Sequence, residues 1–230
     1  MSSIVFTKTL EIPDEMTPKP ADNFIPDWYK KMESYIGGNK RPTGDGNTTG
    51  TIKKCMPVFD AITGGYIITT PVDVFVSQRD GSPWYEWPSF GPIQFHPVEQ
   101  APNHPNKNGH QGSYPKWINP WAIKTPPGYS TLFVQPFHRD SVFTILPGIV
   151  DTDTYDAPVN FPFVLNDVTM EGIIPAGTPM AQVIPFKRES WNMKIGTQED
   201  FANQNKTTVK LRTRFFDSYK TQYRQPKEYK

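Results

Sequence analysis

Residues 125–188 read TPPGYSTLFVQPFHRDSVFTILPGIVDTDTYDAPVNFPFVLNDVTMEGIIPAGTPMAQVIPFKR, and this stretch decides the fold. Short runs rich in β-branched and aromatic residues alternate there with Pro and Gly turns. None of these runs repeats its apolar residues at the spacing of a helix. Many short strands joined by tight turns are typical of sandwiches and barrels, so the stretch predicts a mainly β domain.

Further strands are expected before this stretch, at residues 4–10, 66–70, 72–76, 93–96 and 121–124. Inside it, alternating or continuous apolar runs predict strands at residues 129–135, 142–146, 159–165 and 180–186. Two other segments, residues 80–90 and 97–120, are expected to be an aromatic turn region and a long polar loop.

Helices are expected only towards the two ends of the chain. Pro26 and Asp27 suit the first turn of a short helix, which Gly37 and Gly38 end. Residues 197–200 read TQED, a typical capping box, and a mainly helical tail is expected to run from there to about Gln225. We therefore divide the chain into an N-terminal arm with a short helix and a flexible loop (1–50), a β-rich core domain (51–195) and a basic aromatic helical tail (196–230).

The length and charge of the chain limit the functions that it could have. The chain of 230 residues can bury a real core, and its formal net charge of +1 predicts no global attraction to nucleic acid or to an anionic membrane. Residues 206–230 nevertheless hold eight basic residues against two acidic ones, interleaved with aromatic side chains. Nucleic-acid binding by this tail stays open, beside docking of its aromatic side chains on the core or on a neighbouring subunit.

Neither secretion nor a membrane span is expected. Cys55 is the only cysteine, which excludes an intrachain disulfide and suits a reducing compartment. The N-terminus lacks the basic and then apolar plan of a signal peptide, and no apolar run is long enough to cross a bilayer.

The first candidate for chemistry is an acidic turn within residues 148–156. Asp151, Asp153 and Tyr155 are our candidate catalytic residues there. A carboxylate held at the end of a strand can act as a general base on water, or hold Mg²⁺ through its oxygens. The alternative is that these Asp residues hydrogen-bond their own turn, as Asp does in most turns.

The histidines are the second candidate, as ligands of a metal ion. His96, His110 and His138 are the residues considered, but no pair has the spacing that zinc enzymes use, so no metal site is assigned. Gly-rich phosphate loops and a Gly-x-Ser-x-Gly elbow are absent from the sequence. No complete catalytic set is therefore recognised.

From residue 124 to residue 188 the order of elements resembles the β-clip proteins of the dUTPase and dCTP-deaminase superfamily. Residues 148–153, GIVDTD, look like the family's Gly-Val-Ile-Asp-x-Asp, and residues 174–182, IPAGTPMAQ, look like its closing Gly-Asp-x-x-Ala-Gln element. The resemblance implies a β-clip fold in which Asp151 faces a nucleotide sugar and water, and Gln182 contacts base or phosphate. Mg²⁺ is implied as a cofactor only by this nucleotide hypothesis.

The same resemblance suggests three further ligand-binding residues and also has gaps. Tyr66 follows two glycines, as in the family's Ala-Gly-Tyr-Asp, while His138 and Arg139 stand where the family carries an arginine-serine motif. Residues 136–141, PFHRDS, match that motif poorly. No glycine follows Gly196, so the family's mobile glycine-rich phosphate arm is missing.

A second resemblance covers more of the chain. Residues 25–31, 52–57, 121–126, 148–155 and 173–191 look like an uncharacterised family that occurs in tailed bacteriophages and in some bacteria. It implies a viral source, with the cytoplasm of the infected host cell or the virion as the expected place. The partners it implies are further copies of the chain or other phage proteins.

Three hypotheses of function follow. The first is a phage-encoded binding or structural protein, virion- or assembly-associated, that forms homo-oligomers. The second is a deoxynucleotide-processing enzyme of the dUTPase or dCTP-deaminase type. The third is a metal-dependent enzyme that uses the histidines.

Overall fold

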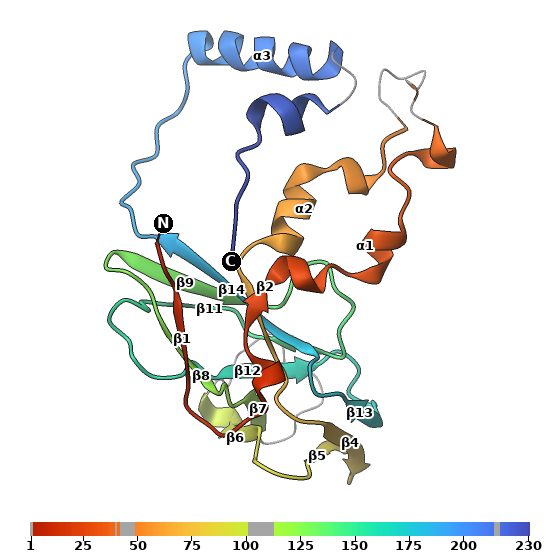
Figure 1. The fold of residues 1–230 in the computed structure, drawn as a ribbon, viewed down its shortest axis with the longest axis vertical. Helices are drawn as coiled ribbons and strands as arrows, with labels where there is room; N and C mark the ends of the chain where they lie inside the picture. The colour runs from red at the N-terminus through yellow and green to blue at the C-terminus, as the bar shows by residue number, and fades with distance from the viewer. Residues whose placement is uncertain (1, 40, 42–48, 101–112, 214–216) are drawn as a thin grey trace. The chain divides into compact units, whose positions relative to one another are not determined.

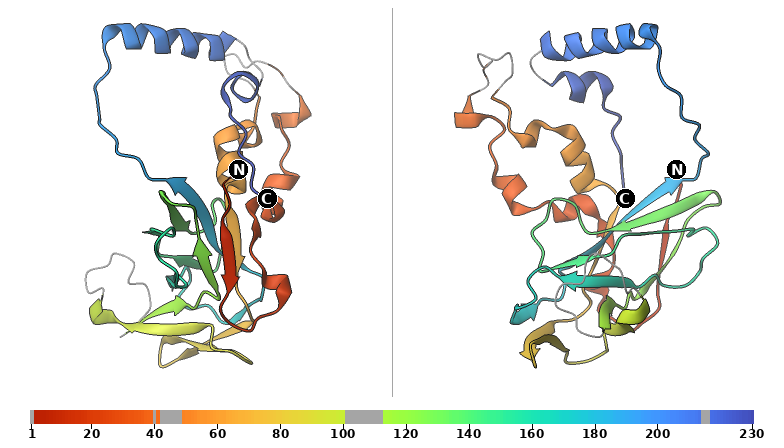
Figure 2. Two further views of the ribbon diagram at one scale, coloured as in Figure 1. Left: turned by 60° about the vertical axis from the view of Figure 1, so that its left-hand side comes forward. Right: turned by 180° about the vertical axis from the view of Figure 1, so that it is seen from behind.

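The computed structural model describes residues 2–39, 41, 49–100, 113–213 and 217–230 (Figure 1). It is mainly β, with several antiparallel sheets and few helices, which confirms the predicted fold class at this level. Figure 2 shows the same elements from two further directions. Within the described ranges no helix is both long and apolar enough to cross a membrane.

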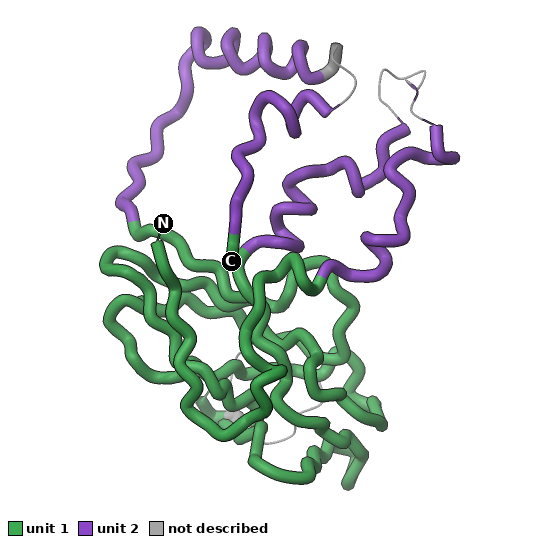
Figure 3. The backbone as a smooth tube through the Cα atoms, viewed as in Figure 1, with its two compact units in different colours: residues 1–24, 65–188, 229–230 green, residues 25–64, 189–228 purple. Residues whose placement is uncertain are grey.

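The chain divides into two compact units that alternate along the sequence (Figure 3). Unit 1 consists of residues 1–24, 65–188 and 229–230, and unit 2 consists of residues 25–64 and 189–228. Every strand of the described chain belongs to unit 1, and the α-helices belong to unit 2. The domain boundaries at residues 50 and 195 stay a prediction.

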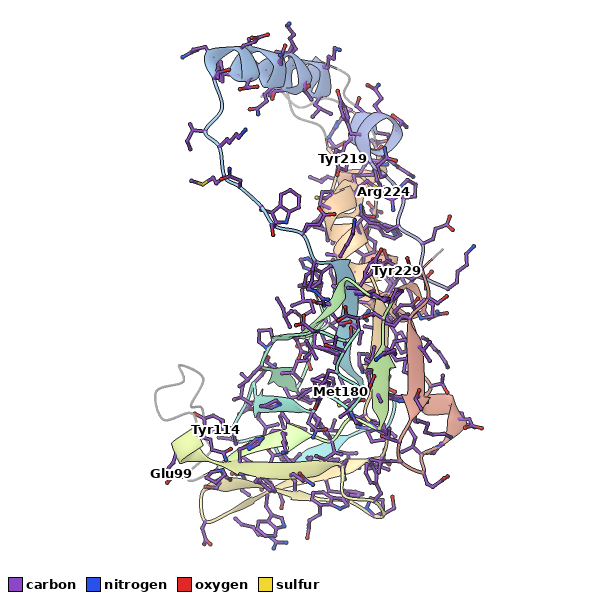
Figure 4. The ribbon with its side chains drawn as sticks, turned by 90° about the vertical axis from the view of Figure 1, so that its left-hand side faces the viewer. Glu99, Tyr114, Met180, Tyr219, Arg224 and Tyr229 are labelled. Carbon is purple, nitrogen blue, oxygen red and sulfur yellow. The ribbon has the colours of Figure 1, made fainter. Side chains whose placement is uncertain are left out.

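The largest sheet of unit 1 has five strands in the order β11-β9-β14-β3-β2. β14 lies in its middle and pairs antiparallel with both β3 and β9. Met180 on β14, labelled in Figure 4, is fully buried, as is Gln182. The strands of this sheet are β2 (Lys19–Pro20), β3 (Tyr66–Thr69), β9 (Tyr129–Val134), β11 (Gly148–Val150) and β14 (Pro179–Lys187).

Two smaller sheets and a strand pair complete unit 1. One sheet has the order β10-β12-β7-β6, with β6 (Ile93–Pro97), β7 (Ser113–Trp117), β10 (Phe143–Ile145) and β12 (Phe161–Leu165). The other has the order β13-β4-β5, with β4 (Val74–Arg79), β5 (Ser82–Glu86) and β13 (Gly172–Ile174). β1 (Val5–Lys8) pairs with β8 (Trp121–Lys124).

Aromatic side chains of the four-stranded sheet form the centre of the core. Phe163 on β12 stacks on Trp117 of β7 with ring centroids 4.8 Å apart, and it meets Phe143 of β10 at 5.5 Å. All three side chains are fully buried. β12 lies between β10 and β7, so its inward side chains contact both neighbours, and each aromatic pair adds about 0.5–1.5 kcal/mol beyond its buried area.

The turn before β3 depends on a glycine. Gly65 has a φ of +75°, and a Cβ atom there would lie 2.0 Å from the carbonyl oxygen of Val183 on β14. Only glycine tolerates both the left-handed backbone and this close approach of two chains. Gly65 therefore lets the start of β3 lie against the middle of β14.

Unit 2 contains α1 (Asp27–Lys31), α2 (Met56–Thr63) and α3 (Gln198–Thr213). The capping box predicted before α3 is present. Thr197 Oγ1 accepts a hydrogen bond from the backbone N–H of Asp200 at 3.3 Å, and Asp200 Oδ2 accepts one from the backbone N–H of Thr197 at 2.7 Å. These bonds satisfy amide groups that the first turn of a helix leaves without partners.

The structure corrects four local predictions. The expected turn region 80–90 contains β5, and the expected loop 97–120 contains β7. Residues 56–63, for which we predict no helix, form α2. The helix expected to end at Gly37 and Gly38 already ends at Lys31, because Met32 has an extended backbone. The tail is helical over α3 and again over a π-helical turn, Tyr219–Tyr223.

Candidate functional site: the acidic turn and its pocket

The acidic turn directly follows β11 in unit 1. β9 pairs with β11 on one side and with β14 on the other: Val150 is opposite Thr131, and Lys187 is opposite Tyr129. The end of β11 and the end of β14 are thus held near the same end of β9. This pairing brings residues 151–153 and Arg188 together, although they are far apart in the sequence.

Arg188 is the centre of this cluster. Its Nη1 donates to the Tyr129 carbonyl oxygen (2.8 Å), to Ser130 Oγ (3.1 Å), to Asp151 Oδ1 (3.2 Å) and to Asp153 Oδ1 (2.8 Å). Its Nη2 donates to Asp153 Oδ2, and its backbone N–H donates to the Gly128 carbonyl oxygen at 2.8 Å. We call Arg188 with these partners the Arg188 clamp. A guanidinium that faces a carboxylate with two nitrogens gives a directional ion pair.

Asp153 is the more deeply held of the two carboxylates. Its side chain is only 5% exposed, and its Oδ2 also accepts the backbone N–H of Gly128 at 2.8 Å. The hydrogen bonds from Arg188, followed by the one from Gly128, lower the pKa of Asp153 to about 2. A carboxylate that is this stable in its ionised form is a poor general base near neutral pH.

Asp151 is more exposed but is also engaged. Its Oδ1 accepts Ser130 Oγ at 2.6 Å in addition to Arg188, and its side chain is 62% exposed. Its carbonyl oxygen accepts the backbone N–H groups of Thr154 and Tyr155 at 3.0 and 2.9 Å. Asp151 therefore organises its own turn, which is the alternative that the sequence left open.

A network of buried hydroxyl groups stabilises the acidic turn. Thr152 is 1% exposed, and its Oγ1 lies 2.7 Å from Thr125 Oγ1 and 2.8 Å from Thr131 Oγ1. On the outer side of the turn, Asp156 forms an ion pair with Lys124. Side-chain and backbone hydrogen bonds together stabilise the turn.

Two of the predicted ligand-binding residues, Gln182 and Tyr66, make contacts within unit 1. Gln182 is fully buried on β14, and its Oε1 accepts the backbone N–H of Phe137 at 3.0 Å. Tyr66 on β3 packs edge-on against Phe6 and Tyr229, and its hydroxyl donates to the Lys230 carbonyl oxygen at 3.3 Å. Burial raises the pKa of Tyr66. Figure 4 labels Tyr229.

The other two lie in the loop between β9 and β10. His138 is exposed and has a left-handed backbone, with a φ of +54°. Arg139 donates from Nη1 to the Phe24 carbonyl oxygen. Its Nε and Nη2 are buried without a hydrogen-bond partner among the residues described, and burial lowers the pKa of Arg139 to about 10.

A pocket of about 340 Å³ lies beside the acidic turn, and only one predicted catalytic residue, Tyr155, lines it. His96 from β6 and Lys116 from β7 supply two basic side chains, and Asn160 supplies an amide whose Oδ1 accepts the Asn119 backbone N–H at 3.1 Å. Among the described lining residues the others are apolar, and none is Asp or Glu. Its other lining residues are Val150, Pro158, Val159 and Pro162.

The predicted site residues therefore do not gather around one cavity. Asp151 and Asp153 belong to the Arg188 clamp, Tyr155 and His96 line the pocket, and Gln182 lies in the core. Within the described chain no group of three or more His, Cys, Asp or Glu side chains could hold a metal ion. His110 lies outside the described residues.

Sequence reasoning missed Arg188 and Lys116. Arg188 directly follows β14, and a basic residue there carries no local signal of its partners 35 and 37 positions away. Lys116 lies in a strand that the sequence presented as loop. The sequence did not single out Arg188 as the partner of the two predicted aspartates.

A scan of protein-family models and a search of curated proteins found no match to this chain.

Proposed function

We propose that this protein is a phage-encoded binding or structural protein, virion- or assembly-associated, whose unit 1 is a β-clip-like body. The observation that carries the proposal is the Arg188 clamp. The two carboxylates that a hydrolytic mechanism would use are bound by Arg188, Ser130 and the Gly128 amide. They stabilise the backbone where β9, β11 and β14 meet, which is a structural role.

Phosphate recognition lacks support at the same place. A phosphoryl-transfer site needs cations or backbone amides that face the phosphates. Arg188 is paired with two carboxylates, Lys124 is paired with Asp156, and the Gln182 side chain accepts the Phe137 amide. Because these polar groups are engaged within unit 1, the contacts support a structural role for unit 1.

Charges of the basic tail are also partly neutralised within unit 2. Arg224 donates to Asp60 Oδ1 at 2.7 Å, and Lys227 lies 2.8 Å from Asp60 Oδ2. Lys54, which lies outside the tail, forms an ion pair with the tail residue Asp217 at 2.6 Å, and this pair holds the tail within unit 2 without neutralising one of its cations. Cations that are satisfied internally are poor contacts for nucleic-acid phosphates, so these pairs support docking of the tail over nucleic-acid binding.

The test is turnover of deoxynucleoside triphosphates, including dUTP and dCTP, with and without Mg²⁺. We expect neither hydrolysis nor deamination from the wild-type protein. Turnover that the variant Asp151→Asn abolishes, and that the matched variant Asp156→Asn retains, would refute the proposal. Recovery of the chain from purified virions or assembly intermediates would support the assembly role. If the chain is absent from virions, we expect it in the host cytoplasm.

A second candidate function is supported by the pocket alone. Tyr155, His96 and Lys116 face one cavity of about 340 Å³, which is within the size range of small-molecule sites. A deoxynucleotide-processing enzyme with Mg²⁺ as cofactor is the form of this candidate that the family resemblance implies. Calorimetric titration with dUTP and dCTP tests this candidate function. Nucleotide binding by the wild type that is lost in the Tyr155→Ala variant would favour it.

A further inference from the structure

The pocket beside the acidic turn lies on one face of the four-stranded sheet in unit 1. Side chains alternate between the two faces of a strand. Trp117 on β7 is directly opposite Phe161 on β12, and both side chains are buried in the core. The next pair, Lys116 and Pro162, therefore points to the opposite face, where both residues line the pocket. The pocket thus uses the face of this sheet that points away from the aromatic core.

Strand β6 brings a second basic side chain to the same face. β6 and β12 are the two neighbours of β7 in the sheet (Figure 1). Gln94 on β6 is directly opposite Lys116, and His96 follows Gln94 by two residues. His96 and Lys116 are therefore diagonal neighbours on one face, a spacing of about 7–8 Å that one small ligand can bridge.

The connection between β11 and β12 supplies the other wall of the pocket. It contributes Tyr155, Pro158, Val159 and Asn160, and Val150 lines the pocket from the end of β11. The backbone N–H of Tyr155 donates to the Asp151 carbonyl oxygen at 2.9 Å. Hydrogen bonds of the acidic turn therefore help to position the wall that carries Tyr155.

The polar side chains of the pocket are available to a ligand. Lys116 and His96 are half-buried, and Tyr155 is 45% exposed. Among the residues that the structure describes, none forms a hydrogen bond or an ion pair with these three side chains. A partly buried ammonium group without a counter-charge gains from an anionic ligand, because a hydrogen bond to a charged partner is about twice as strong as a neutral one.

Asn160 adds a donor of known identity. Its Oδ1 accepts the backbone N–H of Asn119 at 3.1 Å. This bond orients the amide, so its Nδ2 group is the part that Asn160 can offer to a ligand. Lys116 and Asn160 therefore both present donors, and the matching ligand group is an acceptor.

Charge and volume limit what this acceptor can be. Lys116 carries the one fixed charge among the described lining residues, since His96 counts as neutral at pH 7. A carboxylate brings one negative charge, whereas a phosphomonoester brings about 1.5–2 at pH 7. The volume of about 340 Å³ lies at the lower end of the range of small-molecule sites, about 300–1,000 Å³. Both quantities favour a small carboxylate over a nucleotide.

We propose that this pocket binds a small organic acid, an apolar ring or branched chain that carries one carboxylate. The carboxylate accepts hydrogen bonds from Lys116 Nζ and Asn160 Nδ2. The apolar body lies against the remaining wall, which consists of Val150, Pro158, Val159 and Pro162. The proposal goes beyond the assembly role and does not depend on it, and its ligand class differs from the nucleotides of the second candidate function.

NMR titration of the full chain with three probes tests the ligand class. Benzoate carries the carboxylate, benzamide has the same shape without the charge, and phenyl phosphate carries the larger charge. We expect benzoate to shift the backbone amide signals of His96, Lys116 and Asn160. It should bind about 10-fold to 100-fold more tightly than benzamide, because hydrogen bonds to charged groups contribute more than neutral ones. Phenyl phosphate should bind more weakly than benzoate.

Variants of Lys116 test which cation holds the carboxylate. Lys116→Met should weaken benzoate binding about 10-fold to 100-fold and leave benzamide binding unchanged, whereas Lys116→Arg should retain most of it. Lys19→Met is the matched control, because exposed Lys19 lies on β2, at the opposite edge of the five-stranded sheet from β11. It should bind benzoate as the wild type does. Equal circular dichroism spectra show that the variants fold.

Four results would overturn the proposal: benzoate leaves the pocket amides unshifted, benzamide binds as tightly as benzoate, phenyl phosphate binds more tightly, or Lys116→Met binds benzoate as the wild type does. An equal loss in Lys19→Met would likewise exclude a specific role of Lys116. Turnover of dUTP or dCTP with benzoate binding intact would overturn the proposed function and leave the carboxylate site standing. Recovery of the chain from virions without benzoate binding would have the reverse meaning.

Discussion

The pKa of Asp153 gives a direct measure of the Arg188 clamp. In the wild type the two-nitrogen contact from Arg188 and the 2.8 Å hydrogen bond from Gly128 lower this pKa from 3.8 to about 2. In Arg188→Gln the cation is lost and the Gly128 amide remains. The pKa of Asp153 should therefore rise by roughly one unit or more and stay below 3.8, since an adjacent arginine lowers a carboxyl pKa by about 1–3 units.

Carbon-13 NMR titration of the Asp153 carboxyl group measures both values. Because its pKa is lowered on folding, Asp153 contributes stability that is present above pH 3.8 and is lost as the pH falls through about 2. The stability gap between wild type and Arg188→Gln should thus be constant above about pH 5 and shrink below pH 4. Lys124→Gln, which breaks only the neighbouring pair with Asp156, is the control. A wild-type pKa near 3.8, or a value near 2 in Arg188→Gln, would refute the clamp.

Three further changes test contacts in unit 1 and unit 2 outside the clamp. Gly65→Ala forces a Cβ to 2.0 Å from the Val183 carbonyl oxygen at a φ of +75° and should lower the free energy of unfolding by about 3 kcal/mol in urea denaturation. Gly81→Ala has a similar φ of +73° with open space around it and should cost only about 1 kcal/mol; equal losses would contradict the close approach. Thr152→Val leaves the hydroxyls of Thr125 and Thr131 without their shared partner and should cost about 1–3 kcal/mol, whereas no loss in thermal denaturation would argue against the network. Asp60→Asn should weaken the hold on Arg224 and Lys227 and speed amide hydrogen exchange of residues 217–228, with exchange in β14 unchanged.

The strands that the sequence predicted well are those with unambiguous local chemistry. β8 covers the predicted residues 121–124, and β9 and β14 begin and end within one residue of prediction, because their β-branched and aromatic runs lie between Pro and Gly turns. The capping box before α3 was also predictable, since Thr197 and Asp200 interact over a single helical turn.

Three of the missed elements, α2, β5 and β7, contain a proline. Pro57 reads as a helix breaker but lies in the first turn of α2, where its missing N–H costs nothing. Pro83 lies in β5, a terminal strand of its sheet, and Pro115 lies in β7, which is nonetheless buried through Tyr114 and Trp117. Burial against the rest of the sheet overrides the local signal in β7, and no local pattern reveals that burial.

The candidate site was predictable only as a set of residue types. Asp151 and Asp153 were rightly placed in a turn at a strand end, but their partner Arg188 comes from another strand, and the pairing depends on the order β11-β9-β14. Long-range strand order cannot be derived from the spacing of residues in one sequence. The same order decides that Gln182 faces the core.

Native mass spectrometry of the full chain tests the central claim most directly, namely that this protein works by associating with further copies of itself. The account predicts a species at twice the chain mass of 26.2 kDa, or at a higher multiple of it, whose share rises with concentration. A single species of 26.2 kDa at all concentrations would contradict it.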